Sequence, residues 1–406
     1  MPPTHVEPST EIPSFLESRT IVFSRLTVFL DTISRGVARL TEGKGWALRC
    51  AGLAMMVSLF FCFPGYGSLG KRTSPCLEAN DFRVAHPLSP IPAKLKDPQS
   101  YLGDEAGGAD HNKAAEPRII IPLLGWLSRT GPATWVVWNH IAGFCIFAML
   151  AHLAFEAFGD RVTGAIFVLS CAVTFFGSWP FNDFTCGDAV AQAFLLLTLR
   201  FPAFLPSFLG LLAAALTDER SLFTIPLLVT VQVLRCKTGN ISCSKWKMGA
   251  LGLGLSLPVF VGIRWYMATR LGMHTGKSSL MLGDILRYHM TSGLPWTLVG
   301  IFKALWLFPL LGVAGLLANR RWKESFLICA GLGCAATPAF LVWDFDRSLT
   351  YAVPALIGSL YLFGRDSMLN RRFMSAILVV NMALTSPYKN VVRSLVMAGL
   401  SRLHLH

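Results

Sequence analysis

The sequence predicts an all-α protein that crosses a membrane many times, and two observations support this fold class. Of the 406 residues, 53% are hydrophobic and only 15% are charged, whereas about 25% of residues are charged in an average soluble domain. Apolar stretches of roughly 17–25 residues, the length that a helix needs to span a bilayer, recur along most of the chain. They predict a polytopic membrane protein with about eleven transmembrane helices and a long first outer loop.

The N-terminal segment, residues 1–45, is predicted to be cytoplasmic. It has no early apolar core followed by a small-residue cleavage site, so its pattern differs from that of a signal peptide. The stretch 15–40 is partly amphipathic and carries four arginines, which favours a helix in the membrane interface. The polytopic membrane domain is expected over 46–387, and residues 388–406 form a short basic tail.

Within the membrane domain, the first predicted span is 46–69, and it leads into an outer loop, 70–117, that contains Pro, Gly and acidic residues. The apolar segment 119–127 is too short to span a bilayer and predicts an interfacial or re-entrant helix. Three prolines break the region from 188 to 235 into short helices. The other expected helices are 133–158, 162–180, 188–199, 201–217, 221–235, 246–269, 294–318, 324–343, 348–363 and 373–387.

Charges between the predicted helices sort by side. Basic loops on one face identify it as cytoplasmic, because Lys and Arg are retained there. Their residues are Arg235, Lys237, Lys245, Lys247, Arg320, Arg321, Lys323, Arg365, Arg371 and Arg372. The opposite face carries the acidic turns, which contain Asp183, Asp188, Asp218, Glu219, Asp344 and Asp346. We therefore expect a multi-pass protein of a cell membrane with a cytoplasmic N-terminus.

The net charge of +13 is spread over helix ends, with no dense basic patch, so no nucleic-acid partner is expected. Membrane lipids with anionic headgroups account for it better. Most of the ten cysteines lie in apolar runs, and no CxxC or CxxxH spacing predicts a metal site. Cys236 and Cys243 share a predicted cytoplasmic loop, which is a reducing location. No nucleotide-binding glycine loop and no GxSxG elbow occurs, and no cofactor is predicted.

Two acidic turns also contain an arginine: Arg220 follows Asp218 and Glu219, and Arg347 follows Asp346. One interpretation is a local ion pair worth less than about 1 kcal/mol. The other is an arginine that binds a phosphate through two hydrogen bonds while the acids orient it. The sequence leaves both open.

Three further cations fall at or inside apolar segments. Arg118 opens the segment 119–127, where it either snorkels to the interface or meets an anionic headgroup. Arg264 and Lys303 lie inside apolar runs, where a charge faces a cavity or a partner unless it lies close enough to the helix end to snorkel.

Several short patterns occur together along 46–363. They are the outer-loop acids Glu78, Asp81, Asp104 and Glu105, the segment Arg118–Leu124, Gly187-Asp188-Ala189, Ala215–Arg220 before Pro226, and Asp346-Arg347 before Tyr351 and Pro354. In this arrangement the chain resembles the GT-C superfamily of integral-membrane glycosyltransferases, which use polyprenyl-phosphate-linked sugars, and in particular uncharacterised bacterial members.

The resemblance implies a lipid-linked sugar donor, an acceptor that is a lipid, a glycan or a protein, and the bacterial inner membrane as location. By position, Asp81 and Glu78 would be the catalytic acids of the first outer loop. One of them would deprotonate or orient the acceptor hydroxyl, and Arg118 or Arg347 would stabilise the departing phosphate without a metal. The residues expected to bind substrate are Arg118, Asp183, Asp188, Asp218, Glu219, Arg220, Asp346 and Arg347.

Two other classes of function stay open at this point. A secondary transporter would need ionisable residues near the bilayer midplane on broken helices, whereas most acids here are predicted at the outer surface. A non-catalytic membrane assembly protein would leave its carboxylates scattered. Convergence of Asp81, Asp183, Asp218 and Asp346 on one outward pocket would count against it. No particular protein partner can be predicted.

Overall fold

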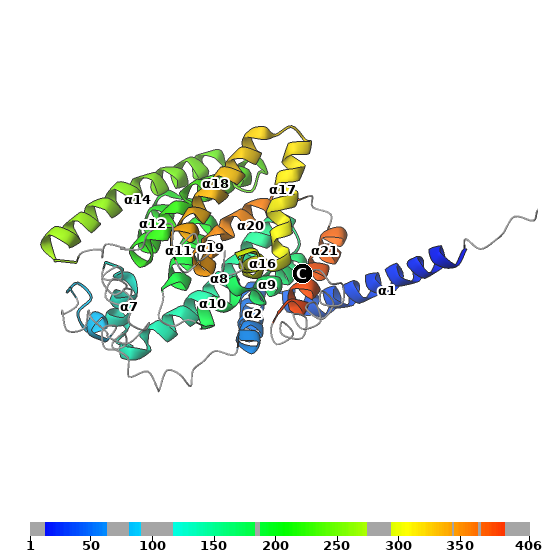
Figure 1. The fold of residues 1–406 in the computed structure, drawn as a ribbon, viewed down its shortest axis with the longest axis horizontal. Helices are drawn as coiled ribbons and strands as arrows, with labels where there is room; N and C mark the ends of the chain where they lie inside the picture. The colour runs from blue at the N-terminus through cyan, green and yellow to red at the C-terminus, as the bar shows by residue number, and fades with distance from the viewer. Residues whose placement is uncertain are drawn as a thin grey trace, which may run out of the picture.

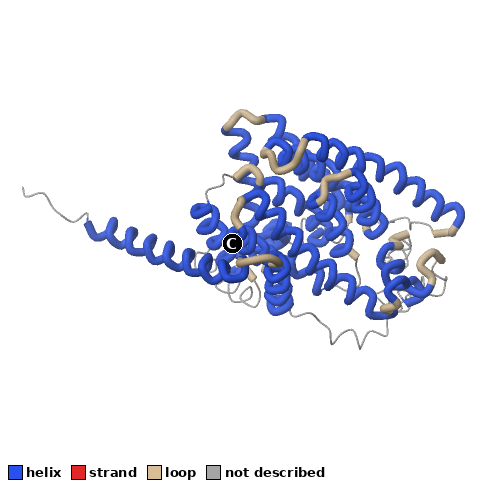
Figure 2. Tube along the Cα trace, turned by 180° about the vertical axis from the view of Figure 1, so that it is seen from behind, coloured by secondary structure: helices blue, strands red, loops and turns tan. Residues whose placement is uncertain are grey.

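The computed structural model describes residues 13–62, 81–90, 117–182, 187–273, 294–342, 345–363 and 367–385. Within these ranges the chain consists of helices, turns and loops without a strand (Figure 2). The prediction of an all-α protein is therefore confirmed for the described residues.

Four stretches of described helix are long and apolar enough to cross a membrane. They are α8 (Thr134–Phe158), α14 (Cys243–Arg270), the stretch Leu298–Ala318 and α18 (Trp322–Leu341). A bent pair adds a fifth if it counts as one span, and the shorter apolar helices Trp46–Phe61 and Phe204–Thr217 accompany them. The expected number of about eleven spans stays a prediction.

The remaining elements lie within or close to the expected segments, several of which are divided. The α-helices are α1 (Pro13–Ala38), α2 (Trp46–Cys62), α7 (Ile120–Ser128), α9 (Arg161–Ala172), α10 (Phe175–Asn182), α11 (Asp188–Arg200), α12 (Phe204–Thr217), α13 (Ile225–Lys237), α16 (Leu294–Phe302), α17 (Leu307–Ala318), α19 (Phe345–Leu349), α20 (Val353–Leu360) and α21 (Ser367–Ala383). The 3₁₀ turns are η1 (Arg39–Thr41), η2 (Gly131–Ala133), η3 (Glu219–Thr224), η4 (Lys303–Trp306) and η5 (Thr350–Ala352).

The expectation of one continuous helix over 162–180 is wrong. The chain forms α9 and α10 instead, and the two are bent by 67°. At Gly177 the chain returns so close to α9 that a Cβ atom would lie 2.2 Å from the carbonyl oxygen of Cys171. A sharp bend of this kind needs a glycine at the point of closest approach.

Three more segments expected as single helices are also interrupted. The segment 294–318 breaks at Lys303, whose φ of 50° lies in the left-handed region. The segment 348–363 consists of the end of α19, η5 and α20, and Pro354 lies in the first turn of α20. The segment 221–235 begins as η3 and becomes α13 at Ile225, followed by Pro226. Proline cannot donate to the preceding turn, so both prolines start a new helix.

The core of the protein forms around α8, which packs against α2, α9 and α11 (Figure 1). Phe147 and Leu150 of α8 and Ile166 of α9 are completely buried. Next to this core, α12 lies between α11 and α14. At Gly252 of α14 a Cβ atom would lie 2.5 Å from the carbonyl oxygen of Phe204, so a small residue permits this close packing.

The two ends of the molecule differ in shape. Helix α7 lies at one end, and α1 projects from the other end beyond the helical body (Figure 1). Helix α1 is joined to α21 by the ion pair of Asp31 with Arg372 and by a hydrogen bond between Ser34 and Ser375. Its placement in the membrane interface stays a prediction.

Candidate functional site

Six of the residues predicted to bind substrate lie together at the end of the molecule that holds α7. They are Arg118, Asp188, Asp218, Glu219, Arg220 and Arg347, and we call them the arginine–carboxylate cluster. They come from four separate parts of the chain. Three arginines face three carboxylates in this group, so its formal charges balance.

The cluster forms where helix ends approach closely. A Cβ atom at Gly187 would lie 2.5 Å from a side-chain carbon of Ile121 and 2.8 Å from one of Thr217. The absence of a side chain there lets the start of α11 approach α7 and the end of α12. Asp218 ends α12 in an extended conformation and directly precedes η3. Its side chain accepts a hydrogen bond from the backbone N–H of Arg220 in η3. A carboxylate in this position caps the new turn.

Arg220 is the centre of the cluster. Its Nε donates to both oxygens of Asp218, at 2.9 and 3.0 Å, and its Nη2 donates to Asp188 Oδ1 at 2.7 Å. Its Nη1 donates to Ser348 Oγ at 2.6 Å, and the guanidinium lies over the ring of Tyr351 at 5.5 Å. Both carboxylates are buried, and such charges need several charged partners or hydrogen bonds to be tolerated.

Asp188 links the second arginine to the first. Arg347 Nε lies 2.6 Å from Asp188 Oδ2, while the hydroxyl of Tyr351 donates to Asp188 Oδ1 at 3.4 Å. Gln192, one turn further along α11, donates to the hydroxyl of Thr350. Helix α11 therefore holds α19 and η5 in place through side chains on one face.

Arg118 and Glu219 form the exposed rim of the cluster. Arg118 Nη2 and Nε donate to the two oxygens of Glu219, at 2.6 and 3.1 Å. The Arg118 side chain is 23% exposed and that of Glu219 is 37% exposed, compared with 1% for Asp218. Both side chains of this pair are therefore partly exposed at the surface of the cluster.

The charges around Asp218 settle its protonation state. Burial disfavours the ionised carboxyl, but Arg220 and Arg118 outweigh it and hold the pKa of Asp218 well below its usual range. Asp218 is therefore an anion at neutral pH, and it keeps Arg220 oriented instead of exchanging protons.

A further arginine, Arg264, lies at the rim beside Arg118 and Glu219. Arg264 on α14 interacts electrostatically with Glu219 and Arg118, and its guanidinium lies over Phe260 at 5.6 Å. Its Nη1 is buried and has no hydrogen-bond partner among the described residues. The sequence indicated that this cation faces a cavity or a partner, but it gave no reason to place it beside Arg118.

Of the two predicted catalytic acids, Asp81 lies within the described residues and Glu78 lies outside them. Asp81 lies in a helical turn, described over residues 81–85, and is exposed. In the same turn Arg83 donates to the carbonyl oxygen of Arg118 and lies over the ring of Trp135 at 5.9 Å. This part of the predicted outer loop therefore lies against the chain at Arg118. Glu78 and Asp183 are outside the described residues, as are Asp104, Glu105 and Asp344.

Some residues of the site were missed by sequence reasoning. Asp346 is half-buried beside Arg347 on α19, as its place in the sequence suggested. Gln192, Ser348 and Thr350 were not predicted, because a buried polar residue in an apolar helix gives no signal of its partner. Among the described residues, no group of three or more His, Cys, Asp or Glu side chains could hold a metal ion.

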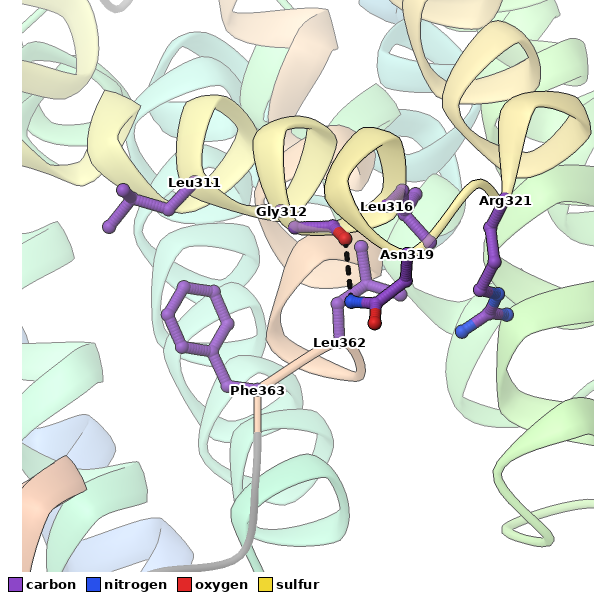
Figure 3. A pocket seen from close by; sticks show the side chains of 8 residues that line it. Leu311, Gly312, Leu316, Asn319, Arg321, Leu362 and Phe363 are labelled. Carbon is purple, nitrogen blue, oxygen red and sulfur yellow. Dashed lines mark hydrogen bonds between the residues drawn. The ribbon is translucent and has the colours of Figure 1, made fainter.

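A separate cavity of about 330 Å³ lies away from the cluster (Figure 3). Its walls come from α17, which contributes Gly312, from Arg321 directly before α18, and from Leu362 and Phe363, which follow α20. At its edge the Asn319 side chain donates to the carbonyl oxygen of Gly315 at 2.8 Å. None of the cluster residues lines this cavity.

Comparison of the chain with protein-family models, with curated proteins and with solved structures finds no match.

Proposed function

We propose that this chain is a GT-C-like glycosyltransferase of a cell membrane, with about eleven transmembrane helices and a cytoplasmic N-terminus. It moves a sugar from a polyprenyl-phosphate donor to a lipid, glycan or protein acceptor on the non-cytoplasmic face. The observation that carries the proposal is the arrangement of four arginines at one end of the helical bundle. Two of them are held by buried carboxylates, and two lie at the rim.

The rim is the part that fits a phosphate. Arg118 already presents two parallel N–H donors to the carboxylate of Glu219, and a phosphate offers the same acceptor geometry. Arg264 adds a buried Nη1 without a described hydrogen-bond partner. Because Arg264 lies on an apolar helix of transmembrane length, a lipid-linked phosphate could reach it from the bilayer while its isoprenoid chain stays in lipid.

The buried part of the cluster would position the reacting groups. In the proposed reaction, the acceptor hydroxyl attacks the anomeric carbon of the sugar, and the bond from that carbon to the phosphate oxygen breaks. Asp81, or Glu78 in the same loop, accepts the proton of the hydroxyl. The arginines stabilise the negative charge of the departing polyprenyl phosphate, with Arg347 kept in place by Asp188.

The test uses the purified full-length protein in detergent or liposomes and a labelled polyprenyl-phosphate sugar with membrane acceptors. Asp81→Asn and Arg347→Ala should each reduce transfer by about 10²-fold or more. Arg371→Gln, at the opposite end, is the matched control and should keep the wild-type rate. Asp81 is exposed, so its substitution changes no residue of the buried core. Wild-type rates in both site variants would overturn these assignments.

One observation favours a secondary transporter as a second candidate. Lys303, at the break before η4, donates to the carbonyl oxygen of Val173, at the break between α9 and α10. Broken helices that meet at a charged residue are typical of transporter sites. Substrate uptake by proteoliposomes that is lost in Lys303→Met, without any sugar transfer, would favour this function. Neither uptake nor transfer by the folded protein would favour a non-catalytic assembly role.

A further inference from the structure

Two cysteines lie in contact where α13 is joined to α14. The sulfur atoms of Cys236 and Cys243 are 2.8 Å apart, and they are seven positions apart in the sequence. Cys236 is half-buried and Cys243 is exposed. Among the described cysteines, this is the pair whose sulfur atoms lie in contact.

The turn between the two helices holds the sulfur atoms in place. Arg235 accepts backbone hydrogen bonds from Asn240 at 2.9 Å and from Ile241 at 3.4 Å, which closes the turn after α13. Gly239 has a φ of 76°, a conformation that glycine adopts without strain. Ser242 then caps α14 by accepting a hydrogen bond from the backbone N–H of Lys245. The proximity of the thiols is therefore set by backbone geometry.

Two opposing effects act on the Cys236 thiol. Its hydrogen bond with Cys243 raises its pKa, the positive charge of Lys247 lowers it, and the increase prevails. The thiolate is the form that attacks disulfides, so the reactivity of the pair depends on the closeness of the second sulfur atom. The pair also lies on the face that the Lys and Arg pattern assigns to the cytoplasm, where such thiols are kept reduced until an oxidant appears.

We infer that Cys236 and Cys243 form a reversible dithiol–disulfide site that reacts with low-molecular-weight disulfides. One thiolate attacks the small disulfide RSSR, forms a mixed disulfide and releases the first RSH. The second protein thiolate then attacks the mixed disulfide, closes the Cys236–Cys243 bond and releases the second RSH. Two protein thiols are oxidised, one small disulfide is reduced, and both thiol protons end on the two RSH molecules.

The closed form ties the last turn of α13 to the first turn of α14. Helix α13 follows η3, which carries Glu219 and Arg220, so one helix connects the disulfide site with the cluster. The inference itself does not rest on the proposed glycosyltransferase activity, because its evidence is the geometry of the turn.

The experiment treats the full-length protein with glutathione disulfide, blocks the remaining thiols, and digests with trypsin. Cleavage after Arg235, Lys237 and Lys245 gives the peptides 236–237 and 238–245, which remain joined only if the disulfide has formed. In the wild type we expect the joined peptide, and a dithiol should separate it again.

The variants Cys236→Ser and Cys243→Ser are the matched controls. Each should stop at the mixed disulfide, with glutathione attached to the remaining cysteine. Glutathione retained on either cysteine of the wild type would overturn the inference, because adjacent sulfurs resolve a mixed disulfide quickly. Free thiols in the wild type after treatment would overturn it as well, whatever the variants show.

Discussion

The protein contains buried arginines at both ends of its helical bundle, and the two ends differ in the number and arrangement of the counterions that neutralise these charges. At the end near α1, Arg235 donates to both oxygens of Glu156, at 2.9 and 2.8 Å, and to the carbonyl oxygen of Leu199. At the other end, Arg220 shares Asp188 with Arg347 and also binds Asp218.

The difference supports the proposal of a ligand site at the end that holds α7. The pair of Glu156 and Arg235 is a closed unit in which each charge has one counterion and Arg235 is 1% exposed. The arginine–carboxylate cluster reaches the surface at its members Arg118 and Glu219. Arg264 lies beside them, and its Nη1 atom has no hydrogen-bond partner among the described residues. An ion pair without exposed members stabilises the contact between two helices. In a network that reaches the surface, an arginine can exchange its carboxylate partner for an incoming anion.

The largest expected effect comes from the centre of the cluster. Arg220→Ala leaves Asp188 and Asp218 without their shared cation inside the protein, which should cost about 3–5 kcal/mol of stability. We expect a much lower unfolding temperature in detergent and no measurable sugar transfer. An unfolding temperature equal to that of the wild type would show that the cluster does not contribute to the fold.

The next effect separates the two ends. Replacing both Glu156 and Arg235 with methionine removes a closed pair, and such replacements are often neutral or stabilise by about 1–4 kcal/mol. The double variant should therefore keep its unfolding temperature and its activity, while Arg235→Met alone, which leaves Glu156 without its counterion, should lower the unfolding temperature. The same double replacement at Asp188 and Arg347 should abolish transfer. Loss of activity in the Glu156 and Arg235 double variant would contradict the claim that this pair has no role in sugar transfer.

A smaller effect on stability is expected at the rim. Arg264→Gln removes a charge whose Nη1 has no described hydrogen-bond partner, so the unfolding temperature should change little. If Arg264 binds the donor phosphate, transfer should fall by about 10²-fold. Wild-type transfer would exclude Arg264 from the binding site and leave the phosphate to Arg118 and the buried arginines.

The smallest effect is a pH dependence at the end near α1. Asp160 is half-buried, which opposes ionisation, but its hydrogen bonds from Arg371 and Thr163 lower its pKa to about 2. This pKa lies below the ordinary value of about 3.9, which applies in the unfolded chain. The ionised carboxyl therefore stabilises the folded state fully at a pH above about 4. The stabilisation should fall away as the pH drops from about 4 towards 2.

The contribution of Asp160 is at most about 2 kcal/mol, because Arg371 is 40% exposed and solvent screens the pair. Asp160→Asn keeps a capping oxygen for α9 but removes the charge. Its stability should depend less on pH than that of the wild type between pH 5 and about 2, measured by denaturant unfolding in detergent. Identical pH profiles would exclude Asp160 as the cause.

The sequence predicted the positions of the helices well because apolar runs of sufficient length favour helices wherever they occur. It failed at the interruptions, where single residues decide the path of the chain. Gly177 looks ordinary in an apolar segment, and Lys303 differs from its apolar neighbours by its charge, which says nothing of backbone conformation. The chain nevertheless bends beside Gly177 and enters a left-handed conformation at Lys303. Hydrophobicity averaged over a span cannot reveal such local geometry.

In the candidate site, the sequence predicted the local pairing but not the contacts between distant segments. Asp218 and Arg220 lie two positions apart, so their pairing follows from local geometry. The bridge from Asp188 to Arg347 joins two distant segments, and only the packing of α11 against the region of η3 and η5 brings them together. The same holds for Arg264, which reaches the rim because α14 packs along α12.

By itself the sequence determined the all-α class, the approximate helix boundaries and the set of acids and arginines that could act together. It did so because burial of apolar residues and local charge patterns act over short stretches of chain. The tertiary structure alone decided which charges are closed pairs and which belong to an open network. That decision depends on contacts between segments far apart in the chain, made possible where residues such as Gly187 and Gly252 let helices approach closely.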